Sequence, residues 1–457
     1  MNLTAFSGPS LQAAYLRTLP AIRERCSNVH AMAQQGKLEY FDYCPDHESS
    51  VVNYCLEIMK RDFPAADGGV DFASIPPHGR WRHLDAGKSR IAPLMAKWDE
   101  ERRSPVSEKE KCKRLIDLFL VSVLLDAGAG NKWSYNESDG ESYSRSEGLA
   151  VATVHMFDQG LFSGSPAAQP HRVDGKGDIF RVWSYHLIFL LQAQGLSQIN
   201  ESRIATAMQV SDANPMVGLS GRTSLLVNLK TALESNPRLF GSDARPGNII
   251  DFLESESKLD GSSLRVHVSS LWGVLLEGLA LIWPARYSIG GVQLGDAWPC
   301  SVLATVGQAE GDDFVPFHKL TGWITYSLIE PMEKILKWKF DGIEDMTGLP
   351  EYRNGGLLID FGVLTLKPGL QALANTSGIP CLPPSHSAVV EWRAMTVIEL
   401  DRIADGIRRQ AGVNSCDLTL AQVLESATWK GGREIAKQLR PLTGGPPIEI
   451  ESDGTVF

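Results

Sequence analysis

Apolar residues recur at intervals of three and four positions through most of this chain, which is the spacing of α-helices. Residues 112–128 (CKRLIDLFLVSVLLDAG) are apolar on nearly every side, as is typical of a helix buried in the middle of a protein. The same spacing predicts helices at residues 146–162, 221–237, 263–284, 317–338 and 388–409.

Two residues refine the predicted helix boundaries. Ser146 precedes Glu147 and then apolar residues, so we expect it to cap the helix that follows. Pro331 lies inside residues 317–338, and we expect a break or kink there because proline cannot donate the helical hydrogen bond.

Strand signals are sparse. Residues 51–59 fit either a helix or a strand, and residues 356–366 suit a short strand. No repeat period is present. The pattern therefore predicts a mainly α-helical globular fold.

No flexible linker divides the chain. The polar, Gly/Ser-rich stretches are short, at residues 136–146 and from Thr443 onward. We therefore predict a single large helical domain over residues 1–457 rather than separated domains. Within it, residues 1–110 are predicted to form a helical N-terminal subdomain that carries a basic loop at residues 78–90.

Composition and charge argue against two classes of binding partner, nucleic acids and membranes. With a net charge of −10 and a pI of about 5.6, the chain lacks the basic surface that non-specific nucleic-acid binding needs. The longest apolar stretch, residues 271–284, contains Glu277 and is too short to span a bilayer, so we expect no membrane partner. Seven scattered cysteines without a C-x-x-C pair, and no signal-peptide run, predict a cytoplasmic protein with reduced thiols.

The predicted basic loop at residues 78–90 (HGRWRHLDAGKSR) is the first candidate binding segment. Its Arg80, Trp81, Arg82 and His83 combine cations and hydrogen-bond donors that suit an anionic ligand such as a phosphate. A solvated basic loop in an acidic protein accounts for the same residues equally well.

A second candidate segment follows the buried helix at residues 112–128. Asp126 emerges there into a glycine-rich loop, and Trp133 and Tyr135 could line a pocket for a flat ring. An aspartate that simply ends the helix before a glycine cap is an equally good interpretation. His318 and Lys319, at the start of another predicted helix, are further substrate-binding candidates, although a histidine there is more often structural.

The segment LPEYRNGGLLIDFGVL, residues 349–364, carries the strongest catalytic candidates, Glu351 and Arg353. Pro350 and Gly355-Gly356 predict a tight bend around these two charged residues, and an ordinary surface salt bridge is the alternative. Because Glu391-Trp392-Arg393 repeats the Glu-x-Arg spacing within a predicted helix, we expect a buried charge network, with Glu391 and Arg393 near the substrate.

Several familiar catalytic motifs are absent from the sequence. None of the ten histidines forms H-x-x-x-H or H-E-x-x-H, so a site for Fe or Zn would need ligands from distant segments. There is no G-x-S-x-G elbow and no Walker A loop. The acidic pair in residues 307–315 is not followed by the phosphate loop of a phosphoribosyltransferase.

Longer motifs extend over nearly the whole chain: HGRWRH, LLDAGAG, RSEGLAVA, LSGR, RPGN, VPFHKLTGW, YSLIEP, TGLPEYRNGG, VEWRAMT and SDGTVF. They resemble the uracil catabolism protein 4 family, a helical family carried as a domain of unknown function. That resemblance implies a pathway that opens uracil through a ribosylated urea intermediate. Some members are labelled uracil phosphoribosyltransferases, a label that the missing phosphate loop argues against.

A more distant resemblance suggests a reaction. Glu351-Tyr352-Arg353 with the apolar run to Leu364, residues 391–396, and Leu125-Asp126 are similar to motifs of the queuosine salvage nucleotide N-glycosidases. That likeness implies a DNA-glycosylase-like helical fold, with Glu351 in the place of a catalytic aspartate. The exchange keeps the carboxylate and lengthens the side chain by one methylene.

Both resemblances lead us to expect an N-glycosidase-type hydrolase acting on a ribosylurea or a related ribosyl phosphate. Such a reaction builds positive charge on the sugar, which a carboxylate can stabilise while it deprotonates water. Glu351, Arg353 and Asp126 are the predicted catalytic residues, and the reaction requires no cofactor. The alternatives are a metal-dependent enzyme using Fe or Zn, and a non-catalytic nucleotide-binding regulator. The sequence leaves open whether the protein is a homodimer.

Overall fold

The computed structural model describes residues 9–100, 106–130, 132–165, 169–175, 179–181, 190–192, 195–261, 263–304, 309–375 and 378–451. Helices dominate these residues, which confirms the predicted mainly helical fold. The helices of at least nine residues are α2 (Leu19–Gln34), α3 (Glu48–Asp62), α5 (Ile91–Glu100), α6 (Glu108–Leu124), α7 (Arg145–Asp158), α9 (Leu219–Ser235), α12 (Val268–Gly278), α13 (Lys319–Leu336), α14 (Tyr352–Asp360), α16 (Ser387–Ala411) and α18 (Trp429–Leu439).

Shorter helices connect these elements. They are α1 (Pro9–Leu16), α4 (Arg80–Leu84), α8 (Glu201–Ala207), α10 (Pro237–Phe240), α11 (Ile249–Glu256), α15 (Pro368–Gln371) and α17 (Leu420–Val423). A π-helical turn, Leu424–Thr428, joins α17 to α18.

The strands are two to five residues long and form small separate sheets. Most of them pair antiparallel, whereas β7–β12 and β14–β15 pair parallel. The pairs are β1 (Phe41–Tyr43) with β13 (Leu364–Leu366), β2 (Ser134–Asn136) with β3 (Ser142–Ser144), β4 (Ile179–Arg181) with β5 (Leu190–Gln192), β7 (Ser263–His267) with both β6 (Lys258–Asp260) and β12 (Lys339–Asp341), β8 (Ser288–Ile289) with β9 (Val292–Gln293), β10 (Ala297–Pro299) with β11 (Phe314–Pro316), and β14 (Cys381–Leu382) with β15 (Glu449–Ile450).

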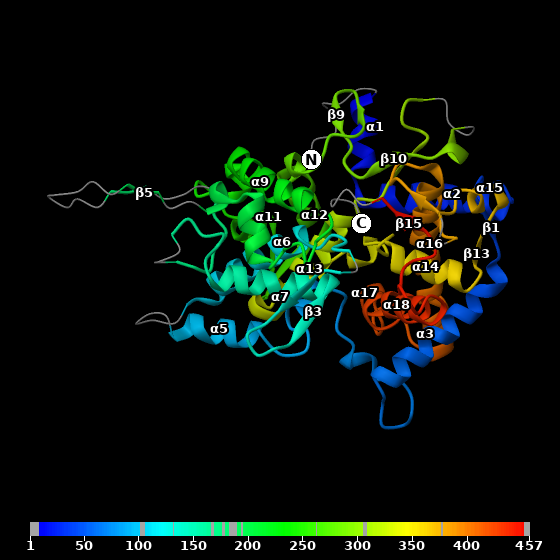
Figure 1. The fold of residues 1–457 in the computed structure, drawn as a ribbon, viewed down its shortest axis with the longest axis horizontal. Coiled ribbons are helices and arrows are strands. Elements are labelled where there is room, and N and C mark those ends of the chain that lie inside the picture. The colour runs from blue at the N-terminus through cyan, green and yellow to red at the C-terminus, as the bar shows by residue number, and fades with distance from the viewer. Residues whose placement is uncertain are drawn as a thin grey trace.

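Helices α6 and α13 pack against each other in the middle of the molecule (Figure 1). On one side lie α7, α9 and α12, and on the other α16 packs against α2, α3 and α14, which in turn contacts α18. The apolar character of α6 on nearly every side follows from this central position, because other helices cover most of its surface.

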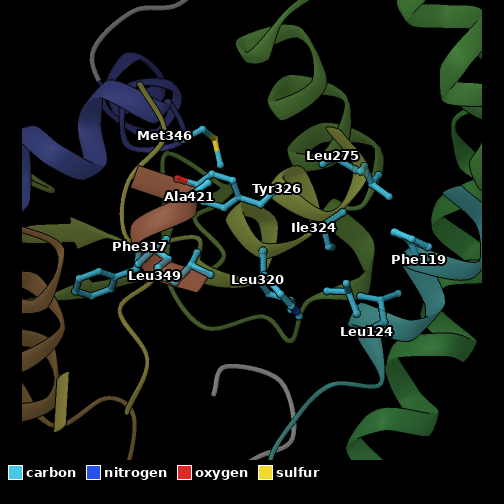
Figure 2. Close-up of a cluster of buried hydrophobic side chains, with 14 of the residues drawn as sticks. Phe119, Leu124, Leu275, Phe317, Leu320, Ile324, Tyr326, Met346, Leu349 and Ala421 are labelled. Atoms are coloured by element: carbon cyan, nitrogen blue, oxygen red, sulfur yellow. The ribbon is translucent and has the colours of Figure 1, made fainter. Parts of the chain in front are cut away.

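One contiguous hydrophobic core takes buried side chains from Leu19 near the start to Ile448 near the end of the chain. Figure 2 shows Ile324 of α13 facing α6, while Tyr326 of the same helix lies toward Met346. The Tyr326 hydroxyl donates a hydrogen bond to the Thr347 carbonyl at 3.1 Å. The glycosylase-like arrangement and the subdomain at residues 1–110 stay predictions.

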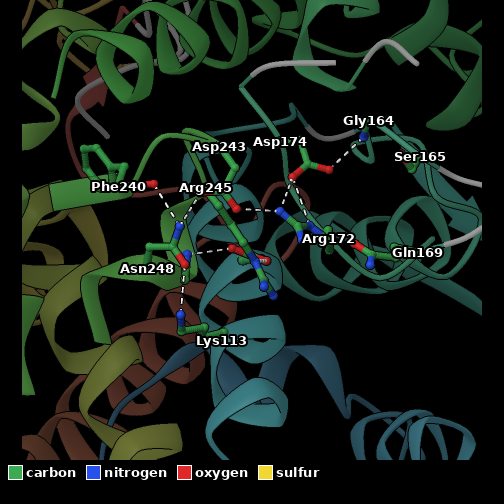
Figure 3. A network of polar contacts seen from close by, with 12 residues as sticks. Lys113, Gly164, Ser165, Gln169, Arg172, Asp174, Phe240, Asp243, Arg245 and Asn248 are labelled. Atoms are coloured by element: carbon green, nitrogen blue, oxygen red, sulfur yellow. Dashed lines mark hydrogen bonds and ion pairs between the residues drawn. The ribbon is translucent and has the colours of Figure 1, made fainter. Parts of the chain in front are cut away.

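A buried polar network fixes α6 to the segment that precedes α11 (Figure 3). Asp117 of α6 accepts hydrogen bonds from Arg245 Nε and from the Gly247 amide, both at 2.7 Å. Nearby, Arg172 contacts Asp174 and Asp243. Burial raises the pKa of Asp117 to about 6, although Arg245 acts in the opposite direction. Since the Asp117–Arg245 and Arg172–Asp243 pairs join distant segments, we assign this network to the fold.

The structure corrects two predicted helix features. Helix α13 continues through Pro331 to Leu336, so the predicted break does not occur, because burial of Pro331 in the packing around the helix outweighs the lost hydrogen bond. The kink stays a prediction. The N-cap of α7 is Ser144 rather than Ser146, since Ser144 is the last residue with extended backbone. Residues 51–59 lie in helix α3, and residues 356–366 end in the short strand β13.

Two predicted loops are helical. Residues 78–90 contain α4, whose Arg80, His83 and Leu84 are buried on one face. Gly355 and Gly356 lie inside α14 and make no bend, because the missing side chain lets α14 approach α16. A Cβ on Gly355 would come within 2.6 Å of Trp392 Nε1.

Among the described residues, no helix is both long and apolar enough to cross a membrane. None of the seven cysteines forms a disulfide bond in the structure.

Candidate functional site

A cavity of about 340 Å³ lies where the N-terminal ends of α7, α13 and α14 meet the loop after α6, helix α18 and the C-terminal segment. Its charged and aromatic lining residues are His78, His83, Asp126, Arg145, Glu147, Lys319, Trp323, Glu351, Tyr352, Arg353, Trp429, Arg433 and Glu449. The cavity therefore combines carboxylates, cations and flat rings contributed by segments far apart in the sequence.

Asp126 is held at the cavity by a buried arginine. Its Oδ2 lies 2.7 Å from Nη1 of Arg80, which also donates from Nε to the Ser122 hydroxyl at 2.9 Å. Burial raises the pKa of Asp126, but the charges of Arg80 and Lys319 outweigh that effect, and the pKa lies below its usual value. Asp126 is therefore ionised at neutral pH.

Glu351 is the N-cap of α14. Its Oε2 accepts a hydrogen bond from the Arg353 amide at 2.8 Å, and its Oε1 accepts one from the Asn354 amide at 2.6 Å. These bonds fix the direction of the carboxylate at the cavity wall. Burial raises the pKa of Glu351 above its usual value, against the effect of the two amides and of Lys319. The pKa values of Asp126 and Glu351 are thus displaced in opposite directions.

Lys319 begins α13 and lines the same cavity. Its amide donates to Asp296 at 2.9 Å, whereas its Nζ has no hydrogen bond or ion pair with any residue that the structure describes. Burial lowers the pKa of Lys319, and Glu351 and Asp126 oppose that shift through their charges. An amine without a protein partner, close to two carboxylates, is available to a ligand.

Two histidines and two tryptophans form an aromatic wall. The His78 ring lies 4.5 Å from the Trp323 ring, and the His83 ring lies 5.4 Å from the Trp429 ring, measured between centroids. His78 Nδ1 contacts Oε2 of Glu425, in the π-helical turn, at 2.6 Å. Burial and the charge of Arg80 lower the pKa of His83 to about 4, so this ring is neutral at pH 7. Such a wall suits a planar, uncharged group.

Three arginines complete the lining. Arg353 Nη1 donates to the Gly444 carbonyl at 2.7 Å, and Arg145 Nη2 donates to the Thr443 carbonyl at 3.2 Å. Arg433 Nη1 donates to Glu147 at 2.6 Å. Burial, followed by the neighbouring charges of Arg353 and Arg433, lowers the pKa of Arg145. The Arg145 guanidinium is therefore close enough to Arg353 and to Arg433 to be repelled by both.

Comparison with known proteins assigns the chain to a family. The model of the family described as "Protein of unknown function (DUF1688)" matches residues 15–457. The chain belongs to this family.

Two relatives are similar to this chain over nearly its whole length. The chain is 40% identical to "Uracil catabolism protein 4" of Lachancea kluyveri, over 97% of this chain and 98% of the relative. It is 38% identical to "Protein urg3" of Schizosaccharomyces pombe, also over 97% of this chain and 98% of the relative. The family resemblance drawn from the sequence motifs is confirmed.

Five of the residues singled out from the sequence meet at the cavity. They are His83, Asp126, Lys319, Glu351 and Arg353. Arg80 lies directly behind Asp126 and is fully buried, so it positions the carboxylate.

The other predicted binding residues on the N-terminal side are not part of the cavity lining. Arg82 forms an ion pair with Glu330, and Trp81 donates its Nε1 hydrogen to Asp85 at 2.9 Å. Trp133 donates to the Met208 carbonyl at 2.9 Å in the core, and Tyr135 stacks on His155.

The remaining predicted residues also have partners elsewhere. His318 contacts the Leu16 carbonyl and lines a second cavity of about 200 Å³. Glu391 accepts hydrogen bonds from the Glu39 and Tyr40 amides at 2.8 and 3.1 Å. Arg393 pairs with Asp296 at 2.8 Å. The two Glu-x-Arg units are buried as predicted, but Glu391 and Arg393 do not reach this cavity.

Several lining residues were not predicted from the sequence: Arg145, Glu147, Trp323, Trp429, Arg433 and Glu449. Trp323 could have been found, because it lies four residues after Lys319 and so on the same helix face. Arg145 and Arg433 carry no comparable local signal, since only the tertiary fold brings α7 and α18 together.

The described residues contain no group of three or more His, Cys, Asp or Glu side chains arranged to hold a metal ion.

Proposed function

We propose that this protein is an enzyme of uracil catabolism, an N-glycosidase-type hydrolase that cleaves the bond between ribose C1′ and a urea or pyrimidine-derived nitrogen. The observation that carries the proposal is the pair Asp126 and Glu351. The two carboxylates line one cavity, and their surroundings displace their pKa values in opposite directions. Such a displacement is the usual mark of carboxylates with different catalytic tasks.

In this mechanism Glu351 acts on the attacking water. Its raised pKa suits a general base, because a base works best when its pKa is close to the working pH. The water oxygen bonds to C1′ as the C1′–N bond breaks. The water proton passes to Glu351 and from there to the departing nitrogen.

Asp126 supplies fixed negative charge. It remains ionised beside Arg80, and its charge stabilises the positive charge that develops on the ribose ring. Lys319, whose Nζ has no partner among the described residues, donates a hydrogen bond to the carbonyl oxygen of the leaving group.

The aromatic wall accounts for selectivity toward a planar group. Trp323 and Trp429 provide flat aromatic rings, and the neutral His83 adds no charge to them, while the Arg433 guanidinium lies 4.8 Å from the Trp429 ring centroid. A urea or ureido group is planar and uncharged, so it suits this wall. The name of the Lachancea kluyveri relative, "Uracil catabolism protein 4", supports placing the reaction in uracil catabolism.

The experiment is to incubate the purified protein with ribosylurea and with its 5-phosphate, and to assay released urea. The samples are measured before and after chelation, alongside metal analysis of the protein. We expect urea release that survives chelation. Release that requires Fe or Zn would replace the proposal by a metal-dependent reaction. Binding without turnover would replace it by a nucleotide-binding regulatory role.

A further inference from the structure

The side of the cavity formed by α7, α14 and α18 concentrates positive charge. Arg145, Arg353 and Arg433 come from these three helices and line the same space. Three carboxylates lie on the same side. Glu147 pairs with Arg433 at 2.6 Å, Glu449 lines the cavity, and Glu351 caps α14, where both of its oxygens accept backbone amides.

Arg353 is the most informative of the three arginines. The residue is only 5% exposed. Its Nη1 donates to the Gly444 carbonyl, and its guanidinium lies 4.9 Å from the Tyr352 ring centroid. Its Nε and Nη2 have no hydrogen-bond acceptor, and the group has no carboxylate at ion-pair distance, among the residues that the structure describes. A buried guanidinium with two donors that no described residue accepts can donate both of them to an anion at this cavity wall.

Helix α7 adds to this preference for an anion. Its N-cap, Ser144, makes no side-chain capping bond, and the first-turn residues Arg145, Ser146 and Glu147 line the cavity. The positive end of the helix dipole therefore faces the same space as the three guanidinium groups.

We propose that Arg145, Arg353 and Arg433, with the first turn of α7, form a subsite for a phosphate monoester carried by the ribosyl substrate. This inference rests on the proposed function, because it names the substrate as a ribosyl phosphate. The Gly444 carbonyl holds the Arg353 guanidinium in place, and Nε and Nη2 of Arg353 donate to the phosphate. Arg145 and Arg433 add positive charge at the same wall. Guanidinium forks match the oxygens of a phosphate dianion better than a single ammonium does.

The test compares ribose 5-phosphate with ribose as probes in calorimetric titrations. We expect the wild-type protein to bind ribose 5-phosphate more tightly than ribose. Arg433→Gln and Arg353→Gln are each expected to weaken binding of ribose 5-phosphate roughly 10- to 100-fold and to leave ribose binding nearly unchanged. Arg433 is partly exposed, so Arg433→Gln carries the test if Arg353→Gln fails to fold.

Arg402→Gln provides the matched control. Arg402 lies on α16 in an ion pair with Glu48 at 3.0 Å, outside the cavity lining, and we expect this variant to bind both probes as the wild type does. Equal affinity of the wild type for the two probes would overturn the subsite. An equal loss for both probes in Arg433→Gln would overturn it as well.

Failure of the subsite and failure of the proposed function give different results. Arginine-dependent binding of ribose 5-phosphate, without urea release from either ribosylurea, would keep the subsite and overturn the hydrolase. Equal kcat/KM for ribosylurea and its 5-phosphate, unchanged in Arg433→Gln, would keep the hydrolase and overturn the subsite.

Discussion

Glu351 faces the cavity because it caps a helix. Both of its carboxylate oxygens accept an amide hydrogen from the first turn of α14, so the group cannot rotate away. Asp126 is fixed in a comparable way by Arg80. Charges held in place before substrate arrives need no reorganisation during the reaction, which is the main advantage of a preorganised site.

Lys319 differs from these residues because the described part of the protein gives its Nζ no partner. We expect Lys319→Met to lower turnover strongly while the melting temperature stays equal or rises, since the change removes a charge that burial disfavours. Thermal melting and the urea assay on the same preparation test this. A large loss of thermal stability would instead identify Lys319 as a structural residue.

For single residues, the sequence predicted several of the charged side chains in the cavity, but not the groups that hold them in place. Asp126 stood out at the end of a buried apolar helix, and Lys319 at the start of another. Glu351 and Arg353 stood out at a predicted bend between apolar elements. The partners of Arg353 and Arg145 in the C-terminal segment were not predictable, because Gly444 and Thr443 contribute backbone carbonyls that carry no residue-specific signal.

Glycines allow helix α14 to pack closely between α16 and α18. A Cβ on Gly355 would lie 2.6 Å from Trp392 Nε1, and a Cβ on Gly432 of α18 would lie 2.1 Å from the Arg353 carbonyl oxygen. The sequence suggested a bend at Gly355-Gly356 because glycine often marks turns. Its actual role is close helix packing, which local sequence cannot distinguish from a turn.

We therefore expect Gly355→Ala to destabilise the protein by about 1–3 kcal/mol, the usual cost of overpacking a filled core. Gly273→Ala in α12 is the control, because nothing lies within 4 Å of the added Cβ. A glycine-to-alanine change in an open helical position is neutral or stabilising by up to about 1 kcal/mol. Urea-induced unfolding measures the stability of both variants. Equal effects of the two substitutions would argue against close packing of α14 at Gly355.

On the scale of the whole molecule, the cavity joins segments from His78 to Ile450, and no part of the chain contains it alone. Helical spacing was enough to predict α6, α9, α13 and α16, since each buries a continuous apolar face. It could not predict how these helices pack, because that depends on contacts between residues hundreds of positions apart.

The burial of His83 links the cavity to the pH dependence of stability. Its folded pKa of about 4 lies below the unfolded value of 6.5, so the unfolded state binds more protons in this interval. His83 therefore contributes stability above pH 6.5 that is lost as the pH falls toward 4. The slope is at most about 1.4 kcal/mol per pH unit.

To test this, unfolding free energies are measured at about pH 7 and about pH 5 for the wild type and His83→Gln. Between these pH values we expect the wild type to lose about 2 kcal/mol more than the variant. Parallel losses in the two proteins would show that His83 titrates normally in the folded state.

The most direct test of the central claim compares Glu351→Gln with Glu391→Gln in the urea-release assay. Glu391 is a matched control, because it is also a buried glutamate that accepts two backbone amides, but it lies outside the cavity lining. Both variants lose a similar structural contact, so similar modest losses of stability are expected. Only Glu351→Gln is expected to lower turnover by at least about a hundredfold. Near-normal turnover in Glu351→Gln, or an equal loss in both variants, would contradict the assignment of Glu351 as the catalytic base.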